Sequence, residues 1–305
     1  MNLHVMKKLV VFIGFLASVT LLSLGNVSAG EKVDKTLDVA SEGEVEISNS
    51  RGKIEVIGWD KNNISVKGEL DDLTEKFIFT TSGKKVLIKV ELPDRSVSSR
   101  SGDGSDLKIF VPQKFTVQFF GIATDITISN IESKVDVSSD SGHIKLNKIK
   151  SRIYINNVSG NIELRDIRGA IEVSTVSGSV KATVLSDNIV IKGVSSDISV
   201  QTDRIEFAQI STVSGNSSLT SHLAIDGSVK LSNVSGDSHF IVKSDLNADI
   251  LLDTGPGGGV VNQYSGDKAE RSSIGSEKLK FTAGSGKGLV KMSTVSGEVA
   301  ISKEK

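Results

Sequence analysis

The chain has 305 residues, with 36 Lys and Arg against 37 Asp and Glu, no cysteine and a formal net charge of −1. This balance argues against nucleic-acid binding, which needs clustered lysine and arginine to neutralise phosphates. The absence of cysteine excludes disulfides and a lipid-modified N-terminal cysteine. Only three histidines lie beyond residue 29, none of them in a zinc-type pair, so a metal site is not expected. The glycine-rich segments 255–259 and 284–288 lack the patterns of dinucleotide- and phosphate-binding loops, so no cofactor is expected either.

Residues 1–29 have the pattern of a cleaved secretory signal peptide. Lys7 and Lys8 precede an apolar stretch from Leu9 to Leu24, and Val27-Ser28-Ala29 has the small-residue spacing that signal peptidase accepts. The sixteen apolar-stretch residues are fewer than the roughly 20 that span a bilayer, which disfavours an uncleaved anchor. We therefore expect a mature protein of residues 30–305 without a transmembrane segment, exported to the periplasm, the cell surface or the medium.

Residues 30–125 predict irregular coils made of short strands. Coiling is expected to begin near Glu44, and Ser50-Arg51-Gly52 reads as a turn. Leu70, Leu73 and Phe77 have helical spacing and predict one short turn of helix. A polar loop is expected from Arg95 to Asp106. The expected strands include 45–47, 54–56, 64–66, 77–79, 86–90, 107–111, 115–119 and 126–128.

The region 126–202 contains regular nine-residue repeats. Between Ile131 and Gln201, the first, fifth and seventh positions of eight successive units are apolar in 23 of 24 cases, and Asp140 is the exception. First positions hold Ile131, Asp140, Ile149, Val158, Ile167, Val176, Leu185 and Val194. Fifth positions hold Val135, Ile144, Ile153, Ile162, Ile171, Val180, Ile189 and Ile198. Seventh positions hold Val137, Leu146, Ile155, Leu164, Val173, Ala182, Ile191 and Val200.

Two apolar positions separated by one mostly polar residue are typical of a strand rather than a helix. Small or turn-forming residues such as Gly160 and Gly178 fill the third position, so each unit reads as a turn followed by a short strand. One such strand cannot bury its apolar side alone, whereas stacked copies form a continuous core.

The Val-Ser-Gly turn recurs at every second unit, at Val158 and Val176, with Val-Ser-Ser at Val194. We therefore predict an all-β, single-chain parallel β-solenoid with about 18 residues per coil, built from two nine-residue units. It is expected to be right-handed by analogy with other parallel crossovers. Residues 203–305 predict looser coils and a terminal cap, in which the Gly- and Ser-rich stretch 254–288 is a loop or part of the cap. Looser copies of the turn begin at Val213, Val234 and Val295.

The sixth, outward position should stack Lys145, Glu163, Lys181 and Ser199 on one face, and Asp136, Tyr154, Glu172 and Val190 on the other. Alternating charge on the first face fits either a substrate groove or a surface charge ladder, and we favour the ladder.

Several segments together resemble one known family. They are GEVEISNSRGKIEV at 43–56, Gly58-Trp59-Asp60, DLKIFVP at 106–112 and the serial Val-Ser-Gly turns. They resemble the bacterial β-strand-repeat proteins called "putative adhesin", over most of the mature chain. The resemblance implies an exported β-solenoid of the cell envelope, and it provides no catalytic residues to carry over.

Three functions are consistent with these features. The first is a non-enzymatic envelope or surface protein, an adhesin-like binding or structural scaffold for a protein or glycan. The second is a polysaccharide-binding or polysaccharide-active β-helix protein. The third is a periplasmic partner-binding or sensory component that adds a strand at an exposed solenoid end. No catalytic constellation is found, so an enzyme is not expected. The candidate ligand contacts are Trp59, Tyr154, Lys145, Glu163 and Lys181.

Overall fold

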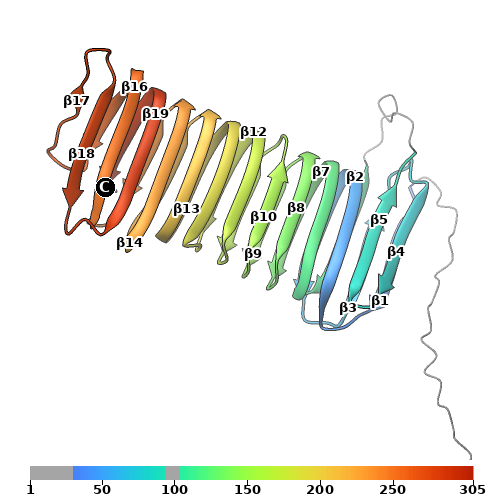
Figure 1. Cartoon of the computed structure of the whole chain (residues 1–305). Coiled ribbons are helices and arrows are strands. Elements are labelled where there is room, and N and C mark those ends of the chain that lie inside the picture. The colour runs from blue at the N-terminus through green and yellow to red at the C-terminus, as the bar shows by residue number, and fades with distance from the viewer. Residues whose placement is uncertain (1–29, 94–103, 305) are drawn as a thin grey trace, which may run out of the picture.

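The computed structural model describes residues 30–93 and 104–304, which form nineteen strands and no helix. The all-β prediction is therefore confirmed, and no described helix could cross a membrane. The predicted signal peptide and most of the predicted polar loop lie outside the described residues. Figure 1 shows the strands stacked along one long axis, with β4 near one end and β17 and β18 at the other.

The strands are β1 (Lys32–Asp38), β2 (Glu42–Trp59), β3 (Asn63–Glu69), β4 (Lys76–Ser82), β5 (Lys85–Glu91), β6 (Ser105–Pro112), β7 (Lys114–Ile131), β8 (Val135–Ser141), β9 (Ile144–Ile149), β10 (Ile153–Asn157), β11 (Ile162–Ile167), β12 (Ile171–Val184), β13 (Asn188–Ser214), β14 (Ser217–Ser235), β15 (Ser238–Val242), β16 (Ala248–Gln263), β17 (Glu270–Arg271), β18 (Glu277–Ala283) and β19 (Gly288–Lys303).

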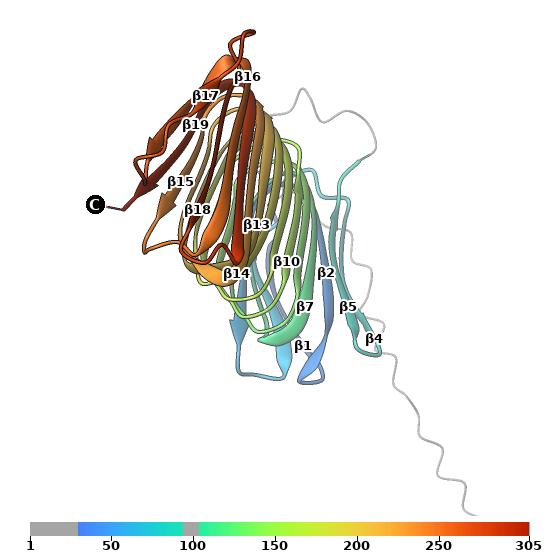
Figure 2. The same cartoon turned by 60° about the vertical axis from the view of Figure 1, so that its left-hand side comes forward.

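In the regular region the chain alternates between two sheet faces that enclose the core (Figure 2). Face A contains β9 and β11, and face B contains β8 and β10. On face B, Ile153 pairs with Val135 on one side and Ile171 on the other, in parallel register. On face A, Ile162 pairs with Ile144 and Val180. Residues at the fifth and seventh positions are buried throughout this region, and each such side chain contributes about 1.5–3 kcal/mol.

The first positions do not form one column. Ile131, Ile149 and Ile167 are buried where the chain passes from face A to face B, whereas Val158 and Val176 are about half exposed at the opposite corner. The two corners differ in backbone conformation. At the first corner the preceding residues Asn130, Lys148 and Asp166 have φ of 61°, 55° and 50°, a left-handed conformation that is uncommon outside glycine.

At the opposite corner, which we call the Val-Ser-Gly corner, a buried polar residue occupies the position before the turn in most coils. Ser139 and Thr175 point into the core, and their hydroxyls donate to the carbonyls of Ser141 and Ser177 at 2.9 and 3.2 Å. The turn glycine is required as well, because Gly160 has φ of 117° and a Cβ there would lie 2.1 Å from the Gly142 oxygen. The turns are thus held from inside by hydrogen bonds.

A ladder of side chains also links successive coils just after this corner. Asp125 Oδ1 accepts a hydrogen bond from the His143 N–H at 2.8 Å, and Asp197 Oδ1 accepts one from the Asn216 N–H at 2.9 Å. Asn216 in turn accepts from the Asp237 N–H at 2.9 Å. Each link satisfies a backbone donor of the next coil, which explains the turn-forming residues at this position.

Both ends of the solenoid depart from chain order. β2 begins at Glu42, close to the predicted start of coiling near Glu44, but it lies between β7 on one side and β5 and β6 on the other. At the far end β19 lies between β14 and β15 on one side and β16 on the other. The first full coil of the chain, β2, and the last strand, β19, are therefore each inserted between strands formed by other segments.

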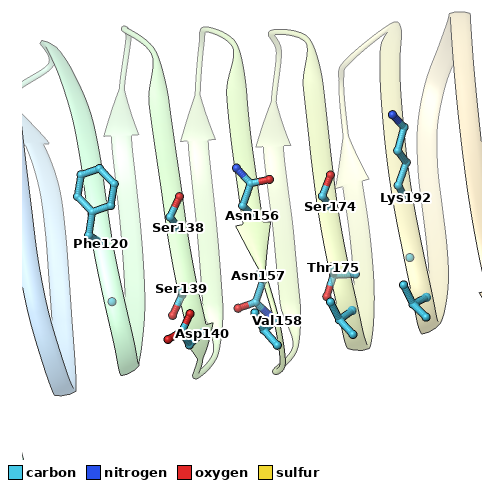
Figure 3. Close-up of a pocket in the computed structure, with 14 residues that line it drawn as sticks. Phe120, Ser138, Ser139, Asp140, Asn156, Asn157, Val158, Ser174, Thr175 and Lys192 are labelled. Atoms are coloured by element: carbon cyan, nitrogen blue, oxygen red, sulfur yellow. The ribbon is translucent and has the colours of Figure 1, made fainter.

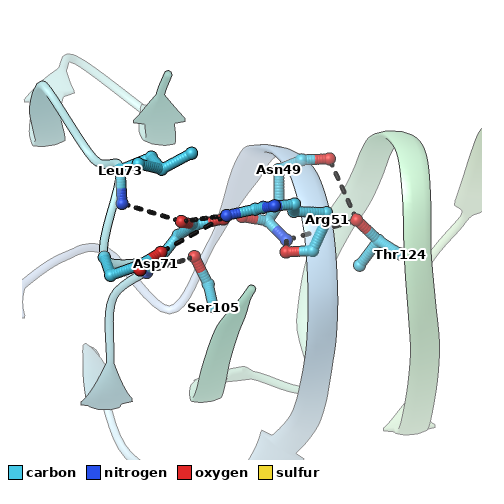
Figure 4. Close-up of polar contacts among 7 residues, drawn as sticks. Asn49, Arg51, Asp71, Leu73, Ser105 and Thr124 are labelled. Atoms are coloured by element: carbon cyan, nitrogen blue, oxygen red, sulfur yellow. Dashed lines mark hydrogen bonds and ion pairs between the residues drawn. The ribbon is translucent and has the colours of Figure 1, made fainter. Parts of the chain in front are cut away.

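The predicted helical turn at Leu70, Leu73 and Phe77 is wrong. Residues 70–75 form a tight turn, in which the Thr74 N–H donates to the Asp71 carbonyl at 2.9 Å. Phe77 already belongs to β4. The turn is fixed by an ion pair between Asp71, whose side chain is 1% exposed, and Arg51 at the corner of β2 (Figure 4). Arg51 Nη2 lies 2.7 Å from Asp71 Oδ1, and the Leu73 N–H donates to the same carboxylate at 2.8 Å.

Burial of Asp71 opposes ionisation, but hydrogen bonds from Arg51 and the Leu73 N–H outweigh it and lower the pKa of Asp71 below its ordinary value of 3.8. A lowered folded pKa means that ionised Asp71 stabilises the protein above pH 3.8, and that this contribution is lost as the pH falls through the folded pKa.

We expect Asp71→Asn to lower the free energy of unfolding by about 3 kcal/mol at pH 7, because it removes the buried carboxylate from the ion pair with Arg51. The difference from the wild type should shrink as the pH falls below 3.8. Urea unfolding at pH 7 and pH 3 measures both effects. Asp72→Asn is the matched control, since Asp72 is 48% exposed and lies 3.3 Å from the same arginine. Equal losses for both variants would contradict this role of Asp71.

Candidate functional site

A line of exposed apolar side chains follows the Val-Ser-Gly corner along the solenoid. We call this line the valine ridge, and its members are 45–55% exposed. The pairs Ser177 with Ser195, Ser214 with Ser235, and Ser235 with Ser296 place the preceding valines next to one another in successive coils. The ridge consists of Val158, Val176, Val194, Val213, Val234 and Val295. Neighbouring strands lie about 4.8 Å apart, so the ridge is continuous.

A trough of about 590 Å³ runs beside the ridge on face B, from β7 to β13 (Figure 3). Phe120 lies at one end and Lys192 at the other. Between them Ser138, Asn156 and Ser174 occupy paired positions on adjacent strands. Five strands at a spacing of about 4.8 Å give the trough a length of about 19 Å. Its long, open form suits an elongated ligand better than a small molecule.

The trough has two chemically different sides. One side offers the hydroxyl and amide groups of Ser138, Asn156 and Ser174, and the other offers the methyl groups of the valine ridge. Its charged residues are Asp140 and Lys192, which lie three coils apart along the trough. Hydrogen-bonding groups beside an apolar line can bind an elongated, amphipathic chain. Among residues 30–93 and 104–304, no group of three or more His, Asp or Glu side chains is placed to hold a metal ion.

The sequence-derived candidate Trp59 lies at the end of β2 on face A. Its ring stacks on Phe110 with centroids 5.0 Å apart, and its indole N–H donates to the Asn63 carbonyl at 2.8 Å. Lys61 Nζ lies 5.0 Å from the ring centroid. The indole is thus held by neighbouring side chains and backbone, which gives it a structural role.

Tyr154 lies on face B, between Asp136 and Glu172 in the register that the repeat predicts. Its hydroxyl accepts a hydrogen bond from Arg152 at 2.9 Å, and Lys134 Nζ lies 4.7 Å from its ring centroid. The tyrosine is therefore surrounded by charged side chains of both signs, and it does not line the trough.

Lys145, Glu163 and Lys181 stack on face A in the predicted order. The carboxylate of Glu163, however, pairs with Arg165 of its own strand. The three side chains of the predicted charge ladder are therefore aligned on adjacent strands. The ion pair of Glu163, however, forms within its own strand and not with a lysine of a neighbouring strand. The five candidate contacts are spread over two faces and do not form one site.

A second concavity of about 440 Å³ lies at the opposite corner, beside the left-handed residues. It is lined by both acidic and basic side chains, and Lys150 pairs with Glu132 at 2.6 Å. Because its charges are of both signs and partly paired with each other, this concavity offers no clear preference for an anion or a cation.

Comparison with known proteins defines the family. The sequence matches the family described as Toastrack DUF4097 over residues 44–302. The chain belongs to the Toastrack DUF4097 family. This agrees with the resemblance seen in the sequence and with the solenoid-like, all-β fold of this Toastrack protein.

Three solved structures are distantly similar to the Toastrack chain. A "putative cell adhesion protein" from Clostridium sporogenes is 11% identical with a TM-score of 0.23, covering 90% of this chain and 100% of that chain. A "putative adhesin" from Bacteroides fragilis is 11% identical with a TM-score of 0.37, covering 90% and 97%. A "putative lipid binding protein" from Parabacteroides distasonis is 12% identical with a TM-score of 0.45, covering 92% and 99%. Similarity at this level carries no argument about ligand or activity. Among curated proteins, none matches the sequence significantly.

Proposed function

We propose that this Toastrack protein is a non-enzymatic, exported scaffold that binds an elongated macromolecule of the cell envelope or surface along the trough and the valine ridge. The valine ridge is the observation that supports this most strongly. Core packing does not explain these valines, because their side chains face solvent in successive coils. Exposed apolar side chains that form a continuous line favour association with a partner.

Several finer features belong to the same proposal. They are cleavage after Ala29, residence in the periplasm or at the cell surface, and right-handed coiling. The mature chain would act as one solenoid, with irregular coils at 30–125, regular repeats at 126–202 and looser coils with a cap at 203–305.

A glycan is a second candidate for the occupant, favoured by the serine and asparagine groups along the trough and by the exposed ring of Phe120 at its end. Trp59, Tyr154, Lys145, Glu163 and Lys181 remain proposed contacts for such a polymer outside the trough. If a variant with alanine at Trp59 and Tyr154 retains polysaccharide as well as the wild type does, those two residues are not ligand contacts.

Co-sedimentation of the purified mature protein with isolated cell walls, membranes and surface polysaccharide of the producing organism tests the proposed function. Val176→Lys should weaken binding to the retained fraction about tenfold, because it places a charge in the apolar contact. Ser199→Lys is the matched control, since it adds the same charge at an exposed position on face A. Binding to no fraction, or equal loss in both variants, would contradict the trough as the binding surface.

A further inference from the structure

The two faces of the solenoid end unequally near the N-terminus. On face A, three strands follow outward from β2, in the order β6, β3 and β1. On face B, only β5 and β4 follow. Face A therefore extends one strand further than face B, and no described strand lies opposite β1. A strand position next to β4 is open.

This difference leaves the end of the core partly uncovered. Phe77 and Phe79 of β4 and Leu37 of β1 pack against the core but are only partly buried. Lys35 of β1 lies on the same side of its strand as Leu37, and its Nζ is 5.3 Å from the Phe77 ring centroid. Among the described residues, the contact of Lys35 is this ring and not a carboxylate. The open position is apolar with one positive charge.

The outer edge of β4 also lacks the features that normally block strand addition. The edge strand β1 carries Lys32, Asp34, Lys35 and Asp38, whereas β4 carries one charge, Lys76 at its first residue, and its remaining residues read FIFTTS, without charge, proline or glycine. At the C-terminal end, β17 pairs with two residues of β18, which itself carries Lys278 and Lys280, and the Glu277 carboxylate accepts the Val260 N–H of β16 at 2.9 Å. β4 is thus the least protected edge of the described sheet.

We propose that β4 accepts one extended strand from a partner protein. This strand would lie opposite β1, cover Phe77 and Phe79 with apolar side chains, and bring a carboxylate to Lys35. Main-chain hydrogen bonds to β4 would provide affinity, and the alternating side chains would provide specificity. The site lies at the end of the solenoid, apart from the trough, and does not depend on the trough being occupied.

A labelled eight-residue peptide of alternating valine and threonine with one central glutamate is a suitable probe, compared with the same peptide carrying lysine at that place. We expect the mature protein to bind the glutamate peptide about tenfold more tightly in fluorescence anisotropy. Lys35→Glu should reverse this preference, whereas Lys32→Glu, on the exposed side of β1, should preserve it. Hydrogen exchange should show new protection at residues 76–82 and not in the trough.

Three results would overturn the proposal. The first is no binding of either peptide by a folded protein. The second is binding without protection of β4, or with a preference that Lys35→Glu leaves unchanged. The third is that, without peptide, the protection of β4 from hydrogen exchange increases with protein concentration. This result would mean that a second copy of the chain pairs with this edge.

Discussion

Removing the chain from Gly288 onward should abolish cooperative folding of the whole solenoid. This deletion takes away β19, which is flanked on both sides by other strands. Val290, Met292, Val299 and Ile301 of β19 are completely buried. At about 1.5–3 kcal/mol for each side chain, their loss is comparable to the total stability of a domain, about 5–15 kcal/mol. The remaining strands would also face an empty position between β15 and β16.

Urea unfolding followed by circular dichroism measures this effect. Lys291→Ala is the control, because Lys291 lies on the same strand with an exposed side chain and should leave the transition nearly unchanged. A simple solenoid would lose only its last coil after such a deletion. A truncated protein that still unfolds cooperatively near the wild-type midpoint would therefore contradict the inserted position of β19.

Ile162→Asp should unfold the protein or destabilise it by more than about 4 kcal/mol. Ile162 is 1% exposed and lies between Ile144 and Val180 in the stack of face A. A carboxylate there would be buried without a cation or a hydrogen-bond donor. The adjacent position points outward, so Glu163→Ala removes only the surface pair with Arg165.

Thermal and urea unfolding of both variants test the register directly. Glu163→Ala should change the free energy of unfolding by less than about 0.5 kcal/mol. Similar losses for the two substitutions would mean that the inward and outward positions of β11 have been exchanged, because a shift of one residue moves every side chain to the other face.

The regular coils could be predicted because their signal is local and repeated. Fifth and seventh positions such as Ile162 and Leu164 are apolar in every unit, and all are buried. The burial of first-position side chains cannot be predicted in the same way, because the buried isoleucines and the exposed valines are both apolar. Its two environments depend on corner conformation, as at Lys148, where a left-handed backbone has no clear signal in the residue type.

The strand order at the two ends of the solenoid cannot be predicted, because an alternating pattern indicates a strand but not the strand with which it pairs. Val45 of β2 pairs with Val117 of β7, with β3, β4, β5 and β6 intervening in the chain. The turn at 70–75 is not predictable from its own residues for a related reason. Its leucine spacing fits a helix, but the ion pair between Arg51 and Asp71, distant in sequence, fixes a tight turn instead.

The trough is not predictable from the sequence either, although its residues repeat. Ser138, Asn156 and Ser174 are eighteen residues apart, but polar residues at outward positions are typical of any solvent-exposed face. The sequence feature that could indicate the trough is the repeated valine of the valine ridge beside it. The sequence shows Val-Ser-Gly at one corner and isoleucine at the other, and only the structure reveals that the valines face solvent.

Photo-crosslinking in living cells tests the central claim most directly, by placing a photoreactive amino acid either at Val176 on the valine ridge or at Ser199 on face A. Both positions are exposed and lie on adjacent strands. The account predicts a discrete, high-mass adduct from position 176 and none from position 199. Adducts from position 199 alone, or no adduct from either position in cells that export the protein, would contradict the valine ridge as the binding surface.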